Sequence, residues 1–459
     1  MKILYIGAGF VGACSAAVSA NSGHKTLVFD VDQRKIDLLS SNDRDTIESC
    51  LYERGLGDAI VRNQEYIEFT TDSKKVDDFL DICDAIFLCL PTPEIGETGE
   101  SDLSFYITAL NNLAQALVKR NSGNQDKHII IIDKSTVPVG TAERAELILR
   151  EKGVKNYGIA SNPEFLVGGK AVEGSMKPDR IVVGAKNQED FAIMRDIYQR
   201  FYDNPEVKYI EVTTAEAEAG KLLANFYLFQ KLAVCFDVVG RTCETFTDIR
   251  FENVRKILTS DKRIGSWGFY NSLYAGGSCL IKDARSLSYQ LQTNGKSADL
   301  VTQVYAANKR QLELFLSRFE IEAKDTWEGK KVAVIGLSFK RDTNDTRNSP
   351  SISIVNFLKE KGVSEVRLSD PAAGDAFRHL FPEDSNTKYF PHEFDAAREA
   401  DVIIIAADWP QYRGLADTLI EEVKSNKPVI MDGRRILQHR YEDLAKAEFH
   451  VIAVGSPFI

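Results

Sequence analysis

Cysteine is scarce in this 459-residue sequence, and its placement follows no pattern. The seven cysteines are Cys14, Cys50, Cys83, Cys89, Cys235, Cys243 and Cys279. Their odd number, the lack of a CxxC pair and the lack of histidine at ligand spacing argue against a disulfide framework and against a zinc site. We therefore expect reduced thiols that mostly fill cores, so a catalytic role for any one of them needs support from its surroundings.

Blocks of positive charge are also missing, and the formal net charge is −10. Nucleic-acid binding needs clustered cations to neutralise phosphates, so we expect no nucleic-acid partner. A small anionic substrate remains compatible with this composition, because a few local cations can face it.

The sequence shows no run of about 18 or more apolar residues of the kind that predicts a transmembrane helix. We therefore expect no membrane partner. Met1 and Lys2 precede an apolar stretch that could pass for a secretory signal. The glycines that follow it, Gly7, Gly9 and Gly12, favour a structural explanation. With no signal and with reduced cysteines, we expect a cytoplasmic protein.

The residues that are present are typical of a globular chain, with 44% hydrophobic and 27% charged, and the length allows roughly two to four domains. Near the amino terminus, an apolar run at 2–6, a glycine turn at 7–12 and a second apolar run at 25–29 follow one another. This order of strand, helix and strand predicts a βαβ unit.

Further strand-like runs at 85–90, 128–133 and 180–184 are separated by helical patterns, which predicts a mainly parallel sheet. From about residue 213 the pattern changes, and 214–239 and 297–318 carry helical periodicity over long spans.

A second α/β region begins at 330–337, with strand-like runs at 365–370 and 401–406. Like the first region, it starts with a Lys-led apolar strand that runs into glycine, and it contains a strand ending in Asp. We predict an α/β fold of two Rossmann-like doubly wound domains joined by a long-helix central domain. The expected boundaries are 1–212 for the first, 213–320 for the central and 321–459 for the last domain.

The glycine turn with Asp30 predicts an NAD site. Gly7 permits the tight turn, Gly9 lets backbone approach the pyrophosphate, and Gly12 lets the helix pack on the strand. Asp30 would accept hydrogen bonds from ribose hydroxyls and repel a 2′-phosphate, which favours NAD over NADP. The alternative is a glycine-rich turn with a purely structural role.

A second motif runs from Gly276 and Gly277 through Cys279 to Lys282 and Asp283. Glycines before a cysteine leave its sulfur accessible, and a nearby lysine favours the thiolate that acts as a nucleophile. From spacing alone, a glycine turn with a buried cysteine fits equally well.

Two more segments carry polar residues among apolar ones. Lys221 and Asn225 lie four residues apart on one helix face, where they could stabilise a developing oxyanion, or could form a solvated polar stripe. Glu164 stands between Pro163 and Phe165 after a strand, which suits general acid/base work but also fits an ordinary surface loop.

Taken together and in this order, these motifs resemble the UDP-glucose 6-dehydrogenase branch of the UDP-glucose/GDP-mannose dehydrogenase family. The resemblance covers nearly the whole chain. It includes the motifs at 134–141, 261–265, 336–340, 342–347 and 432–434.

This resemblance implies a four-electron oxidation of the primary alcohol of UDP-glucose to the carboxylate, with two NAD used in turn. Cys279 would form a thiohemiacetal and then a thioester. Lys221 and Asn225 would stabilise oxyanion character, and Glu164 would handle protons. Asp283 and Thr136 would orient the water that hydrolyses this thioester.

The resemblance also assigns binding residues. For NAD they are Gly7, Gly9, Val11, Gly12, Asp30, Lys35, Thr92, Thr136, Ser278, Lys282 and Arg347. For the nucleotide sugar they are Glu164, Phe165, Leu166, Lys221, Asn225, Arg263, Gly276, Phe339, Lys340 and Arg434. Arg263 resembles a residue that reaches a neighbouring subunit's substrate, which implies a homodimer or larger homo-oligomer.

The sequence departs from the family pattern near the predicted sugar pocket. Residues 270–275 replace a proline and further glycines, Leu280-Ile281 replaces an aromatic-proline pair, and Gly168 replaces an acid. These changes leave other nucleotide sugars open as substrates, such as GDP-mannose or a UDP-N-acetylhexosamine. A catalytically silent NAD and nucleotide-sugar binder, or a two-electron β-hydroxyacid dehydrogenase, would not need Cys279.

Overall fold

The computed structural model describes residues 1–122, 127–270, 272–277 and 279–457. The chain divides into two compact units, Met1–Ala224 (unit 1) and Asn225–Ile459 (unit 2). Within these described ranges each unit contains one sheet. The predicted α/β class with two Rossmann-like regions is confirmed.

The sheet of unit 1 has eight strands in the order β3-β2-β1-β4-β5-β6-β7-β8. All neighbours are parallel except β6 and β7, which are antiparallel. The strands are β1 (Lys2–Ile6), β2 (Lys25–Phe29), β3 (Ile67–Thr70), β4 (Ala85–Leu88), β5 (Ile129–Asp133), β6 (Tyr157–Ser161), β7 (Arg180–Ala185) and β8 (Lys208–Val212).

Helices follow most of these strands. They are α1 (Phe10–Asn21), α2 (Gln33–Leu39), α3 (Arg44–Leu51), α4 (Leu56–Arg62), α5 (Ser73–Leu80), α6 (Ser104–Ser122), α7 (Thr141–Glu151), α8 (Ala171–Met176), α9 (Gln188–Ile197), α10 (Gln199–Tyr202) and α11 (Thr214–Val234).

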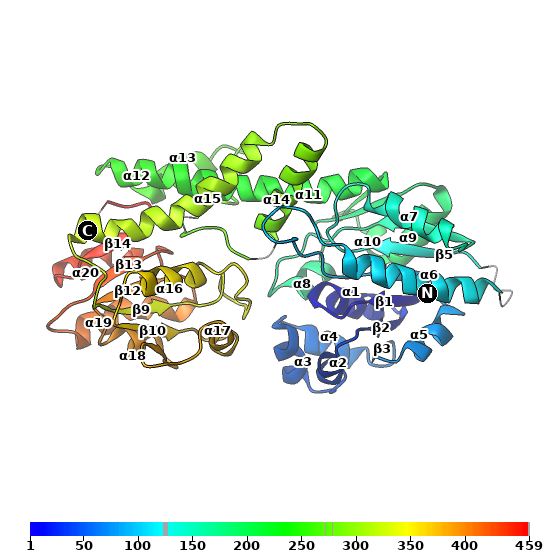
Figure 1. The fold of residues 1–459 in the computed structure, drawn as a ribbon, viewed down its shortest axis with the longest axis horizontal. Coiled ribbons are helices and arrows are strands. Elements are labelled where there is room, and N and C mark those ends of the chain that lie inside the picture. Colours follow the sequence, from blue (N-terminus) through cyan, green and yellow to red (C-terminus); the bar gives the residue numbers. More distant parts are fainter. Residues whose placement is uncertain (123–126, 271, 278, 458–459) are drawn as a thin grey trace. The chain divides into compact units, whose positions relative to one another are not determined.

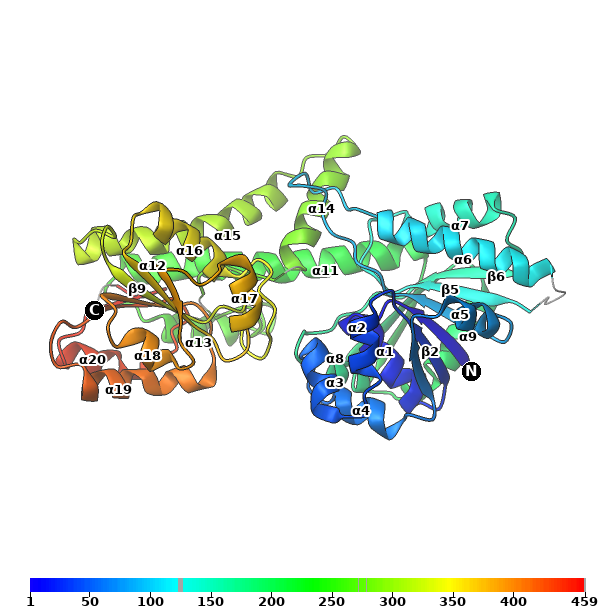
Figure 2. The same ribbon diagram turned by 60° about the horizontal axis from the view of Figure 1, so that its bottom comes forward.

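Alternate residues of β1 enter two different cores. Ile3 and Tyr5 pack with α1, α4 and α8, whereas Leu4 and Ile6 pack with α5, α6 and α7. Because side chains alternate across a strand, a strand covered on both faces must be apolar at nearly every position. The helices on both sides of the sheet are visible in Figure 2.

Unit 2 contains helices and a parallel sheet in the order β11-β10-β9-β12-β13-β14. The strands are β9 (Lys331–Ile335), β10 (Glu365–Ser369), β11 (Thr387–Tyr389), β12 (Val402–Ile405), β13 (Val429–Asp432) and β14 (Val451–Ala453). Short helices around the sheet are α16 (Pro350–Glu360), α17 (Gly374–Leu380), α18 (Glu393–Ala397), η3 (Pro410–Gly414), α19 (Leu415–Glu422), η4 (Gln438–Arg440) and α20 (Tyr441–Lys446).

Ahead of this sheet, unit 2 is helical. After the last turns of α11 come η1 (Cys235–Gly240), α12 (Arg241–Thr245), α13 (Phe251–Thr259), α14 (Leu280–Thr293), α15 (Asp299–Arg318) and η2 (Phe319–Ala323). Helix α15 enters two cores: Val301 and Val304 pack among the helices, and Phe315 and Leu316 pack on the sheet region.

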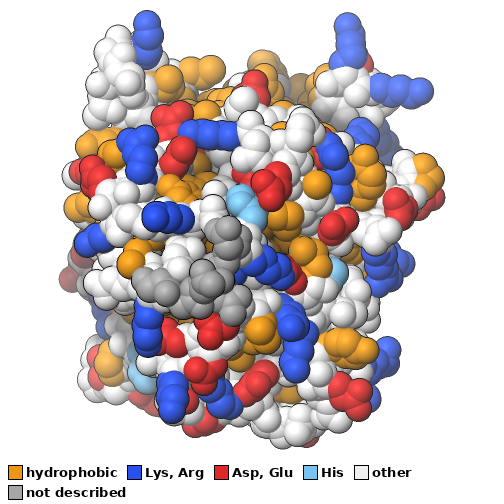
Figure 3. Space-filling model, turned by 90° about the vertical axis from the view of Figure 1, so that its right-hand side faces the viewer, with side chains coloured by type: hydrophobic (Ala, Val, Ile, Leu, Met, Phe, Trp, Pro, Cys, Tyr) orange, Lys and Arg blue, Asp and Glu red, His pale blue; other side chains and the backbone are white. Residues whose placement is uncertain are grey.

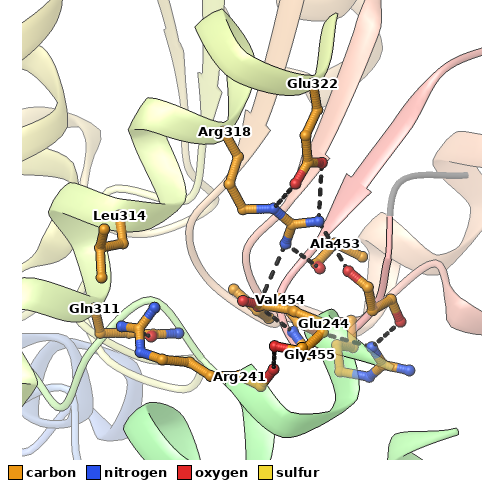
Figure 4. A network of polar contacts seen from close by, with 12 residues as sticks. Arg241, Glu244, Gln311, Leu314, Arg318, Glu322, Ala453, Val454 and Gly455 are labelled. Carbon is orange, nitrogen blue, oxygen red and sulfur yellow. Dashed lines mark hydrogen bonds and ion pairs between the residues drawn. The ribbon is translucent and has the colours of Figure 1, made fainter. Parts of the chain in front are cut away.

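The carboxyl end of α15 is joined to the chain after β14 by a buried arginine (Figure 4). Arg318 pairs with Glu322 at 2.7 Å and donates to the Ala453 carbonyl at 2.8 Å. Glu244 lies 3.3 Å from the same guanidinium and accepts the Gly455 amide. These contacts join three segments of unit 2 that are distant in sequence.

One continuous helix, Thr214–Thr245, is long and apolar enough to cross a membrane by length and composition, and 44% of its apolar window is buried. The sequence was expected to contain no apolar run of this length. That expectation missed this helix, because Lys231 and Asp237 interrupt its apolar residues. Length and composition alone are weak evidence of a membrane span, because the core helix of a globular protein has both.

Candidate functional site

In the glycine turn after β1, two glycines lie in close contact with neighbouring backbone and a third faces open space. A Cβ on Gly7, whose φ is +105°, would stand 2.2 Å from the Cys89 carbonyl oxygen, and one on Gly12 would stand 1.9 Å from the Gly7 oxygen. A Cβ on Gly9 would meet nothing within 4 Å. Gly7 and Gly12 are therefore required by the fold, whereas the space over Gly9 is open to a ligand.

Helix α1 begins directly after Gly9, which provides no side-chain cap. The first amides of a helix have no partner within it and attract anions. Val11 lies half-buried in this first turn. The open glycine and the uncapped amides fit the pyrophosphate of a dinucleotide.

Asp30 follows β2 and lies against the same turn. Its carboxylate accepts the Ala8 amide at 2.7 Å, the Asp32 amide at 3.0 Å and Lys35 Nζ at 3.0 Å. Burial by itself raises the pKa of Asp30, but these hydrogen bonds outweigh burial and lower the pKa below its usual value. The resulting anion suits ribose hydroxyls and disfavours a 2′-phosphate.

The loops after β4 and β5 meet at two of the predicted residues. The hydroxyl of Thr92 donates to the Thr136 carbonyl at 2.8 Å. Thr136 also lines a cavity at the ends of β5 and β6, together with Asp133, Ser135, Val137, Ser161, Pro163, Glu218 and Lys221. In parallel α/β sheets, ligands bind at these carboxyl ends.

Lys221 and Glu164 form an ion pair in unit 1. Lys221 Nζ lies 3.3 Å from Glu164 Oε1 and 5.2 Å from the centre of the Phe165 ring. The other Glu164 oxygen accepts the Leu166 amide at 2.6 Å. With Lys221 5% exposed and Asn225 6% exposed, the alternative of a solvated polar stripe is wrong.

In unit 2, Asp283 is the centre of a polar cluster. It is 1% exposed, and it accepts hydrogen bonds from Asn225 Nδ2 and from Lys282 Nζ, both at 2.6 Å. Its own amide donates to the Cys279 carbonyl, because Cys279 is the N-cap of α14. Cys279 is exposed, so the alternative of a buried thiol is wrong.

Arg347 interacts electrostatically with Cys279. The pKa of Arg347 is raised, first by its hydrogen bonds with Asp345 and further by the charge of that carboxylate and of Cys279. Ser278 and Asn271 lie outside the described residues.

The glycines before Cys279 pack on Phe339. A Cβ on Gly276 would stand 2.5 Å from the Asn348 oxygen, and one on Gly277 would stand 2.9 Å from the Phe339 ring. Lys340 Nζ lies 5.6 Å from the centre of that ring. The structure thus brings Gly276, Phe339 and Lys340 together.

The other two predicted arginines of unit 2 differ in their surroundings. Arg434 donates to Ser272 Oγ at 2.6 Å and to Asp408 at 2.7 Å. Arg263 pairs with Asp261, and its side chain is 90% exposed.

Three family models match consecutive parts of the chain. They describe the NAD-binding domain (residues 1–202), the central domain (215–310) and the UDP-binding domain (333–439) of one family. A UDP-glucose 6-dehydrogenase of Pseudomonas aeruginosa is 31% identical, covering 100% of this chain and 98% of the relative. The chain belongs to the UDP-glucose/GDP-mannose dehydrogenase family. It is an NAD-dependent oxidoreductase with a nucleotide sugar as its small-molecule substrate.

Further relatives and solved structures are similar to this chain over nearly its whole length. A UDP-glucose 6-dehydrogenase of Rhizobium meliloti is 31% identical, covering 100% of both chains. The solved UDP-glucose dehydrogenase of Pyrobaculum islandicum has a TM-score of 0.84 and 27% identity, covering 96% of this chain and 95% of that one. A UDP-D-ManNAc dehydrogenase of Pyrococcus horikoshii, at a TM-score of 0.81 and 20% identity, covers 99% of both chains and shows the shared fold.

Several buried acids of this family member escaped the sequence analysis. Glu53, in the turn after α3, accepts the Gly169 amide at 2.8 Å and the Ala171 amide at 2.9 Å. A Cβ on Gly168 would lie 4.0 Å from Glu53 Oε1, so a carboxylate lies beside the position where the family acid is missing. Glu53 is distant from this loop in sequence, and no local pattern reveals the contact.

Asp133 and Glu218 are two further acids that were missed, and both line the cavity that Lys221 lines. Here a signal was available. Asp133 ends an apolar strand, and Glu218 precedes Lys221 by one helical turn, which places both helix residues on one face.

Positive and negative side chains are interspersed on the face drawn in Figure 3. Among the described residues of that face, Lys and Arg side chains lie between Asp and Glu side chains. This distribution agrees with a sequence that has no block of Lys and Arg.

Proposed function

We propose that this protein oxidises the C6 primary alcohol of a UDP-hexose, UDP-glucose in the first place, to the carboxylate in two steps. The observation that carries the proposal is the cluster at the start of α14, where Asn225 and Lys282 hold the buried Asp283 one turn from the exposed Cys279. NAD, when bound, accepts a hydride in each oxidation. The names of the Pseudomonas and Rhizobium relatives support UDP-glucose as the substrate.

In this proposal Cys279 attacks the aldehyde-level carbon and gives a thiohemiacetal, whose oxidation leaves a thioester that water hydrolyses. Lys221 and Asn225 stabilise the oxyanion that develops at C6. Glu164, paired with Lys221, moves protons to and from the substrate and the hydrolytic water. Asp283 and Thr136 orient that water.

For NAD we propose the glycine turn with Val11, Asp30 and Lys35, and Thr92, Thr136, Ser278, Lys282 and Arg347 for the rest of the cofactor. For the nucleotide sugar we propose Phe165, Leu166, Gly276, Phe339, Lys340 and Arg434. Arg434 is supported by its orientation, since Ser272 and Asp408 hold a planar guanidinium that matches a phosphate.

The proposed assembly is a homodimer or larger homo-oligomer formed through the central helices. Apolar side chains remain exposed along α11 and η1, with Tyr227 67%, Val234 42% and Val238 56% exposed. Their spacing puts them on one side of the helix. An exposed apolar side of this kind is typical of a surface that packs against another chain. Arg263, which follows these helices in the sequence and has an exposed side chain, would reach the substrate of the second copy.

Two further expectations belong to this proposal. The division into domains 1–212, 213–320 and 321–459 is supported by three family-model matches, each of which falls within one of these ranges. A cytoplasmic location follows from the need for NAD and for a reduced thiol at Cys279.

The test is the number of NADH molecules formed per molecule of sugar, measured by absorbance with a panel of nucleotide sugars. We expect about two NADH per UDP-glucose, and a Cys279→Ser variant that fails to complete turnover. The Cys243→Ser variant is the matched control, because Cys243 is buried elsewhere in unit 2, and it should keep the stoichiometry.

Other outcomes correct or remove the proposal. Two NADH from GDP-mannose or a UDP-N-acetylhexosamine would keep the chemistry and change the substrate. One NADH per sugar, or full activity of Cys279→Ser, would contradict the covalent mechanism. Binding of NADH without turnover of any sugar would identify a silent binder.

A further inference from the structure

The cavity beside Lys221 contains an acid that the proposed mechanism does not use. Asp133 ends β5 and is 1% exposed. Its Oδ1 accepts the hydroxyl of Tyr106 at 2.6 Å. Its Oδ2 is buried and has no hydrogen-bond partner among the described residues. A buried carboxylate oxygen without a partner is costly, so a ligand that donates a hydrogen bond is expected there.

The dimensions of the cavity suit a single small ligand. Asp133, Thr136 and Lys221 all line it, and its space for water-sized molecules is about 10 Å³. That volume holds one water molecule when polar groups surround it.

We propose that this cavity binds one water molecule between Asp133 Oδ2 and Lys221 Nζ, and that Asp133 takes up a proton from Lys221 through this water during turnover. In the transfer an N–H bond of Lys221 breaks and an O–H bond forms on Asp133, while the water accepts one proton and donates another. No electrons move, so no oxidant is required. Asp133 acts through Lys221 and is a positioning residue. The proposal rests on the proposed function, in which Lys221 contacts the substrate.

The surroundings of Asp133 place the ionisation of this carboxyl near neutral pH. Burial raises the pKa of Asp133 to about 7, the nearby Glu218 adds to the rise, and the Tyr106 hydrogen bond opposes it. Glu218 is anchored by the amides of Gly140 and Ala142.

Glu164, in the loop after β6, faces Lys221, with Oε1 3.3 Å from Lys221 Nζ. Further charged groups lie on α11, on α7 and beside Asp133 in the chain. Lys221 and Glu218 approach from α11, and Glu143 at the start of α7 raises the pKa of Glu218. Lys134 follows Asp133 in the chain, but its Nζ bonds to Asn162 Oδ1 at 2.9 Å. Among these groups, Lys221 is the cation that lines the cavity with Asp133.

Asp133→Asn removes the ionisation and keeps an oxygen to accept from Tyr106. If Asp133 must be ionised to accept a proton, kcat of the wild type rises with pH through about 7. The Asn variant should lose this rise and retain NAD affinity. An unchanged rise in the variant would overturn the proposal.

Tyr106→Phe gives an independent check that keeps the carboxyl. Because the Tyr106 hydrogen bond lowers the pKa of Asp133, its loss should shift the rise in kcat to higher pH. The substitution removes only the hydroxyl, so the packing of the ring is preserved. No shift in this variant would also contradict the proposal, even if Asp133→Asn fails to fold.

A measurement without substrate separates this proposal from the proposed function. The infrared C=O band of a protonated carboxylic acid should be present in the apo protein below about pH 7 and should be weaker in Asp133→Asn. If no nucleotide sugar is oxidised, the function fails while this band can still be present. If sugars are oxidised and the two spectra are identical, the proton-holding site fails and the function stands.

Discussion

Two glycines of one turn serve different purposes. A Cβ at Gly12 collides with the backbone of Gly7, whereas a Cβ at Gly9 meets nothing. Gly9 has φ −69° and ψ 179°, which alanine adopts without strain. The fold requires Gly12, and the proposed NAD site accounts for Gly9.

This difference predicts opposite phenotypes for two alanine variants. Gly9→Ala should fold as the wild type does and bind NAD at least tenfold more weakly, because the methyl group occupies the space of the pyrophosphate. Gly12→Ala should lower the thermal stability of unit 1, since backbone cannot move away from the new atom. NADH titration and calorimetry on both variants check this. Wild-type NADH affinity in Gly9→Ala would contradict the assignment of the cofactor.

At the scale of elements, Arg318 fastens α15 to the end of the sheet of unit 2. Its side chain is 10% exposed and bonds with Glu322, with Ala453 and with the Ser456 carbonyl. Removing one partner of a buried ion pair leaves the other charge without compensation, which costs about 3–5 kcal/mol.

Arg318→Ala should therefore lower the free energy of unfolding of unit 2 by about 3–5 kcal/mol. Trp267, Trp327 and Trp409, the three tryptophans of the chain, all lie in unit 2, so their emission reports on this unit alone. The control is Arg310→Ala: Arg310 is 44% exposed and pairs with Asp237, and its loss should cost about 0–1 kcal/mol. An equal loss in free energy of unfolding for the two variants would contradict the structural role of Arg318.

Elements with continuous apolar runs could be predicted from the sequence. The runs at 2–6 and 180–184 correspond to β1 (Lys2–Ile6) and β7 (Arg180–Ala185). Strand β8 (Lys208–Val212) could not, because it lies at the sheet edge, where exposed polar residues interrupt any run. The antiparallel pairing of β6 with β7 was also unpredicted, since direction depends on the path between strands.

The candidate site was predictable where chemistry is local in sequence. Cys279, Lys282 and Asp283 share one motif. Asp30 directly follows the second strand of the βαβ unit that contains the glycine turn. Contacts that join distant segments, such as Glu53 with Gly169, need the folded chain.

At the scale of the whole molecule, the proposed dimer depends on the exposed side of α11 and η1. A Tyr227→Glu, Val238→Glu double variant places charges where apolar side chains would be buried between copies. We expect it to sediment as a monomer where the wild type sediments as a dimer. Leu380→Glu, at an exposed leucine on α17, should leave the dimer intact. A monomeric wild type would end the proposal.

The strand orders of the two sheets bear on how the chain is made. β1 and β9 are the first strands of their units and lie inside their sheets, and later strands extend each sheet outward in sequence order on both sides. On the ribosome, every new strand therefore meets an edge that has already emerged, and none has to be inserted between two partners. Assembly can follow synthesis from the amino terminus, with unit 1 closing its sheet at β8 before the strands of unit 2 have been translated.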